Sequence, residues 1–143
     1  MFSAKKIMKL AEEAYEEFSK RHKSMEVELE FVKEDEFFEL ADRSKLVHLE
    51  MREGLPIKVG SLVMHGKKDI IVLCTDVINL LTKNDNFVKA LVMHELFHIL
   101  DKKRVKDSSM NQMIRSEERV HKQFIKEFPN YAELLDEVTG FKI

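Results

Sequence analysis

Residues 84–103 read NDNFVKALVMHELFHILDKK, and this stretch decides how the chain is organised. Asn84 or Asp85 can cap a helix, because a short side chain with an oxygen accepts a hydrogen bond from a free backbone amide in the first turn. The residues that follow are strongly apolar and include no Gly or Pro. We therefore expect one helix over this stretch, with His94 and His98 on the same face.

The four-residue spacing of these two histidines suits metal binding. On a helix both imidazoles project from one face about one turn apart and can bind a single ion. Glu95 lies beside them, and such a carboxylate can take a proton from an activated water and deliver it to a leaving amine. The motif His94-Glu95-x-x-His98 thus predicts two ligands and a general base. The alternative is two histidines packed on a core face, with Glu95 exposed.

A catalytic zinc site requires three protein ligands, so a third must come from another segment. Ser109, followed three residues later by Gln112, resembles a capping box and predicts a second helix that ends before Pro129. Glu117 and Glu118 lie in the middle of that helix. A short turn would bring either carboxylate back to the first helix.

The apolar periodicity of the second helix distinguishes the two glutamates. Its apolar stripe consists of Met110, Met113, Ile114, Val120, Phe124, Ile125 and Phe128. At about 100° per residue, Glu117 falls near the centre of the stripe and Glu118 near its edge. Because a buried carboxylate is costly unless it is paired or bound to a metal, Glu117 is predicted as the third ligand. His121, one turn further along, is the alternative ligand or a hydrogen-bonding partner of one, and a third possibility is that both glutamates are solvated.

These motifs resemble the gluzincins, zinc peptidases with a His-Glu-x-x-His helix and a glutamate ligand on a following helix, and in size especially the minigluzincins. The resemblance covers roughly residues 57–128. It implies an α+β, zincin-like fold with a backing helix, a small sheet, an active-site helix and a glutamate helix. It also implies a metalloendopeptidase with Zn²⁺ on His94, His98 and Glu117 and with Glu95 as general base.

The sequence departs from the gluzincin pattern after the ligand glutamate. Many gluzincins have an Asp or a small residue shortly after it, whereas residues 118–121 here read ERVH. An alternative function is therefore a latent or non-catalytic zincin-like binding module, or a structural metal site. Tyr131 and His65 are weaker candidates for stabilising an oxyanion. The apolar tail at residues 139–143 is expected to dock in or near the cleft.

The remaining segments predict a small, mostly antiparallel sheet with helices around it. We expect helices over residues 3–23, 34–43, from about 76 onwards and over 131–138, and strands over 25–32, 46–51, 57–64 and 69–74. Residues 65–68 are short enough to connect the last two strands as a hairpin. An extended peptide or protein substrate is expected to add to the strand at residues 70–74.

The composition indicates a packed globular protein and excludes several functional classes. With 143 residues, 44% of them hydrophobic, we expect one domain over residues 1–143. A net charge of −2 gives no field that favours nucleic acid, and no apolar run is long enough to cross a membrane. A single cysteine, Cys74, and a start without a signal-peptide pattern lead us to expect a cytoplasmic protein. The sequence does not indicate an oligomeric state.

Overall fold

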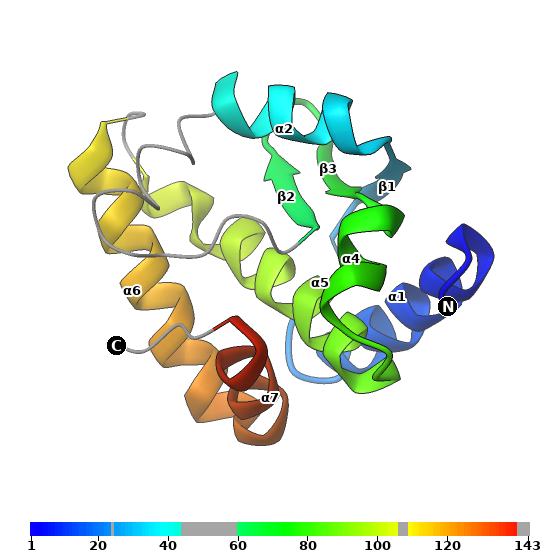
Figure 1. Cartoon of the computed structure of the whole chain (residues 1–143). Coiled ribbons are helices and arrows are strands. Elements are labelled where there is room, and N and C mark those ends of the chain that lie inside the picture. Colours follow the sequence, from blue (N-terminus) through cyan, green and yellow to red (C-terminus); the bar gives the residue numbers. More distant parts are fainter. Residues whose placement is uncertain (24, 44–59, 106–108, 140–143) are drawn as a thin grey trace.

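The computed structural model describes the whole chain except residue 24 and residues 44–59, 106–108 and 140–143. The described part is α+β and contains six α-helices, one short 3-10 helix and a three-stranded sheet (Figure 1). The elements are α1 (Ala4–Ser19), β1 (Val27–Phe31), α2 (Glu34–Arg43), β2 (Ser61–Met64), β3 (Asp69–Leu73), α4 (Thr75–Leu81), α5 (Asp85–Asp101), η1 (Lys102–Arg104), α6 (Met110–Glu127) and α7 (Pro129–Thr139). None of these helices is both long and apolar enough to span a bilayer.

Most of the expected elements are present, with small differences at their ends. The strand expected at residues 46–51 and most of the tail expected to dock in the cleft lie outside the described residues. The second helix begins as expected, because the Ser109 hydroxyl accepts a hydrogen bond of 3.3 Å from the Gln112 amide. The last helix begins at Pro129, earlier than expected, since proline fits the first position of a helix, where its missing amide has no partner to lose.

The sheet is mixed rather than mostly antiparallel, which corrects the sequence-based expectation. Its strand order is β1-β3-β2, with β1 parallel to β3 and β2 antiparallel to β3. Only the β2–β3 hairpin is a local pairing. After β1 the chain passes through α2 and β2 before β3 begins, and this crossover leaves β1 and β3 running in the same direction.

The central position of β3 also corrects the expected site of peptide binding. Its two edges are occupied along their length, with Ile71 opposite Leu29 of β1 and opposite Val63 of β2. A substrate therefore cannot add to residues 70–74. Within the described part of the chain, β2 is an edge strand of the sheet, on the opposite side of β3 from β1.

The two faces of the sheet pack on different helices. Ile71 and Leu73 contribute to the main core together with α1 and α5, whereas Val72 packs on the opposite face with Phe37 of α2 and Val77 of α4. This alternation follows from the two-residue period of a strand. In Figure 1, α2 lies across one end of the strands, and α5 runs through the middle of the molecule.

Helix α5 is the central element of the fold. Asn84 caps it, since its side chain accepts a hydrogen bond of 2.8 Å from the Asn86 amide. The helix contacts α1, α6, α7, β2 and β3, so it is covered on several sides. Phe97 of α5 packs edge-on against Phe18 of α1, with 4.9 Å between the ring centroids. Such a helix holds its side chains in fixed positions, which is what a metal site requires.

Replacement of Gly60 tests the turn that leads into β2. Gly60 has a φ of +86°, and a Cβ there would lie 2.6 Å from Cγ1 of Ile78. Gly60→Ala should therefore lower the free energy of unfolding by about 1–3 kcal/mol, measured by chemical denaturation. Gly66→Ala is the matched control, because a Cβ at that glycine would meet only ordinary contacts, the nearest 3.6 Å away. Equal losses in the two variants would contradict the strain assigned to Gly60.

Candidate metal centre

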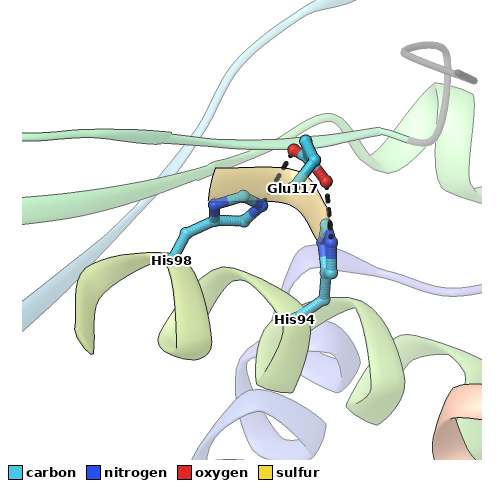
Figure 2. A group of neighbouring side chains, drawn as sticks. All are labelled: His94, His98 and Glu117. Carbon is cyan, nitrogen blue, oxygen red and sulfur yellow. Dashed lines mark ion pairs between the residues drawn. The ribbon is translucent and has the colours of Figure 1, made fainter. Parts of the chain in front are cut away.

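His94 and His98 of α5 meet Glu117 of α6 at the interface between the two helices (Figure 2). The distance from Nε2 of His98 to Oε1 of Glu117 is 2.9 Å, and that from Nε2 of His94 to Oε2 of Glu117 is 3.5 Å. One potential ligand atom from each residue lies within 4.8 Å of the other two. The two imidazole rings are 4.7 Å apart and nearly perpendicular. Their nitrogens thus approach one carboxylate from two directions.

The rotation of α6 about its own axis is the one that its apolar stripe predicts. Glu117 faces α5 with 18% of its side chain exposed, whereas Glu118 is exposed to solvent. Val120 and Phe124, both from the predicted stripe, are buried in the main core. The geometry therefore brings Glu117, and not Glu118, to the two histidines, and its role as a metal ligand remains a prediction.

His94 and Glu117 stabilise each other's charges. Burial alone would lower the pKa of His94, but hydrogen bonds to Glu117 and Glu95 outweigh it and raise this pKa to about 10. Burial alone would raise the pKa of Glu117, but the neighbouring His98 and His94 outweigh it and hold this pKa well below its usual range. The site therefore holds a protonated His94 beside an ionised Glu117, both largely shielded from solvent.

Glu95 points to a different neighbour, the first residue of β2. Glu95 is 5% exposed, and its carboxylate accepts a hydrogen bond of 3.2 Å from the Ser61 hydroxyl. Oε1 of Glu95 also lies 3.5 Å from Nδ1 of His94. Sequence reasoning did not identify Ser61, since nothing in its local sequence distinguishes it from any other strand serine.

The alternative third ligand, His121, takes part in a separate contact. It is buried, with 2% exposure, and its Nε2 lies 3.4 Å from Oδ2 of Asp136 in α7. Burial is the main cause that lowers the pKa of His121, and His94 adds to it. His121 thus lies behind Glu117 on the same helix, where the sequence predicted either a ligand or a hydrogen-bonding partner.

The two residues considered for oxyanion stabilisation have partners elsewhere. The Tyr131 hydroxyl donates a hydrogen bond of 2.9 Å to Glu17 of α1, and burial together with Glu17 raises its pKa to about 12. His65 lies in the β2–β3 connection, where its Nδ1 is 3.1 Å from Asp69. The structure gives neither residue a contact with His94, His98 or Glu117 among the interactions of the described residues.

The pH dependence of stability should report on Asp136. Burial raises its pKa to about 6 from an ordinary value of 3.8, so the protonated acid favours the folded state. This contribution is complete below about pH 4 and is lost as the pH rises through about 6. The measurement is the free energy of unfolding of Asp136→Asn minus that of the wild type, by denaturant unfolding with chelator present. This difference should be about 1–3 kcal/mol larger at pH 7 than at pH 4. Parallel pH curves for the two proteins would contradict this role of burial.

Comparison with known proteins does not indicate a function, so the functional assignment depends on the geometry of the site. No protein-family model matches the chain, and neither a curated protein nor a solved structure does. The functional argument therefore rests on the residue types that converge between α5, α6 and β2, and on the distances between their atoms.

Proposed function

We propose that the chain is a zinc-dependent peptide hydrolase with a zincin-like fold. The observation that carries the proposal is the convergence of two imidazoles and one carboxylate from two helices, with their ligand atoms within 4.8 Å of one another. In this proposal His94, His98 and Glu117 hold Zn²⁺, and Glu95 is the general base. The gluzincin-like motif in the sequence supports the same ligand set.

The donor atoms fit a zinc ion in both type and spacing. Two histidines and one glutamate form a known catalytic ligand set that leaves a fourth position open. Tetrahedral ligands at zinc bond lengths are about 3.4 Å from one another, and one ligand atom from each of the three residues already lies within 4.8 Å of the other two. Small side-chain adjustments are therefore sufficient, and the largely buried surroundings strengthen the attraction between ligands and ion.

The proposal assigns the residues around this ligand set roles in peptide hydrolysis. Zinc supplies Lewis-acid activation of water and of the scissile carbonyl when it is bound. Glu95 takes the proton of the attacking water and delivers it to the leaving amine. Ser61 donates its hydroxyl hydrogen bond to Glu95 and so fixes the direction of the carboxylate. His121 and Asp136 support α6 from the side of α7.

The substrate is an extended peptide that lies along the free edge of β2 in the described part of the chain. An added strand there would form backbone hydrogen bonds like those of the sheet itself. Ser61, the first residue of β2, already contacts Glu95, so a peptide bound on this edge would have its backbone close to the general base. This assignment replaces the expected addition to β3.

A second function has one specific observation in its favour. Glu95 is only 5% exposed and is hydrogen-bonded to Ser61, which would suit a carboxylate that stabilises a metal-binding module without turnover. In such a module His94, His98 and Glu117 still hold the metal, but Glu95 takes part in no reaction. Activity measurements separate the two functions, whereas metal binding alone does not.

Substitution of the two adjacent glutamates tests the ligand assignment. Glu117→Ala should abolish tight zinc binding, because it removes the only carboxylate within ion-pair distance of both histidines in the described residues. Glu118→Ala is the matched control and should leave zinc affinity nearly unchanged, since Glu118 is exposed. Zinc content after purification and competition with a chromophoric chelator provide the measurement. If neither variant loses zinc, the third ligand is another residue, and His121→Ala becomes the next variant.

Substitution of the proposed base separates catalysis from metal binding. Glu95→Gln should retain the fold and stoichiometric zinc, because this residue is not a ligand, and lower peptide hydrolysis by about 10²–10⁴-fold. Cleavage of a broad peptide library provides the measurement, with His94→Ala as the control that loses both zinc and activity. Loss of zinc in Glu95→Gln would contradict the role of base, and zinc without turnover in the wild type would favour the non-catalytic module.

A further inference from the structure

Asp101, the last residue of α5, makes a dense set of contacts with α6. Its Oδ1 accepts a hydrogen bond of 2.8 Å from Nε of Arg119, and its Oδ2 accepts one of 2.8 Å from the same guanidinium. Oδ2 also accepts a hydrogen bond of 2.7 Å from the Ser116 hydroxyl. Asp101 is 8% and Ser116 7% exposed, whereas the Arg119 side chain is 29% exposed, so these three bonds lie at the edge of the interface between α5 and α6. We call Asp101, Ser116 and Arg119 the helix clamp.

The helix clamp surrounds the proposed ligand on α6. Ser116 immediately precedes Glu117, and Arg119 follows it by two residues. On α5, Asp101 follows His98 by three residues, and these positions lie on the same side of a helix. One stripe of α5 therefore carries both the proposed histidine ligands and the acceptor of the helix clamp. Both sets of contacts reach the same segment of α6.

The geometry of a helix makes this arrangement specific for one rotation of α6. Ser116 and Arg119 are three residues apart and reach Asp101 together only when α6 presents that side to α5. A shift by one residue turns the helix by about 100° and would bring Glu118 towards the histidines in place of Glu117. The two-point contact between a carboxylate and a guanidinium is directional, so it resists such a rotation.

We propose that Asp101 is a positioning residue, which sets the rotation of α6 through Ser116 and Arg119 and thereby brings the Glu117 carboxylate to His94 and His98. The inference rests on the proposed function only in that His94, His98 and Glu117 bind a metal. It concerns metal affinity and not turnover. Asp101 itself is not in the ligand group that the structure brings together among the described residues.

A second buried aspartate provides a matched control. Asp69 of β3 is 5% exposed and also pairs with a cation at the end of α5, with 2.6 Å from its Oδ2 to Nζ of Lys102. It accepts no hydrogen bond from α6 among the contacts of the described residues. Its loss should destabilise the protein through an unpaired lysine and a weakened β3, without changing the rotation of α6.

The experiment compares zinc affinity with stability in Asp101→Asn, Asp69→Asn and the wild type. Zinc affinity is measured by chelator competition at 25 °C, and melting temperature by calorimetry in chelator. Asp101→Asn should bind zinc about 10- to 100-fold more weakly, the range for groups that orient ligands, and its Co²⁺ derivative should have an altered visible spectrum. Asp69→Asn should lower the melting temperature and leave affinity and spectrum unchanged.

A third variant covers the case in which Asp101→Asn does not fold. Arg119→Lys keeps the positive charge but loses the two-point contact, so it should weaken zinc binding while the fold is retained. Equal zinc affinity in the wild type and in the folded helix-clamp variants would overturn the positioning role of Asp101. A wild type that binds no zinc would instead overturn the metal centre, and with it the inference.

Discussion

Burial of α5 on several sides is the constraint on which the site depends. A polar side chain inside such a helix destabilises the fold unless a neighbouring element supplies a partner. Each polar group in its second half has one: both histidines contact Glu117, Glu95 contacts Ser61, and Asp101 contacts Ser116 and Arg119. The sheet and α6 are therefore fixed relative to α5 by polar contacts as well as by apolar packing.

The features predictable from sequence are those with a local signal. The caps at Asn84 and Ser109 give the starts of α5 and α6, because a cap depends on residues within one turn. The direction of Glu117 follows from the apolar stripe, since the period of a helix converts sequence position into orientation. The pairing of Glu117 with the histidines needed one more step, the expectation that two helices joined by a short connection pack together. Its chemical role remains a prediction.

The features that sequence reasoning missed depend on residues far apart in the chain. Ser61 and Glu95 are 34 residues apart, and Asp101 and Arg119 are 18 apart. No periodicity or local motif marks such pairs, because they form only after the elements pack. The mixed sheet has the same origin: the alternation of β1 identifies it as a strand but does not specify its partner or its direction. These pairings are decided by tertiary packing and not by local preference.

The position of α1 behind α5 has a consequence for how the chain folds. Phe18 packs on Phe97, and β1 pairs with β3 beyond an intervening helix and strand, so much of the core is built from contacts between distant segments. Pairings between distant segments form later than local ones, because chain entropy is lost before the contacts that offset it can form. Until α1 and α6 both dock, α5 exposes its apolar surface and offers other chains a place to associate. The segment that carries the histidines can thus also associate with other chains while the protein folds.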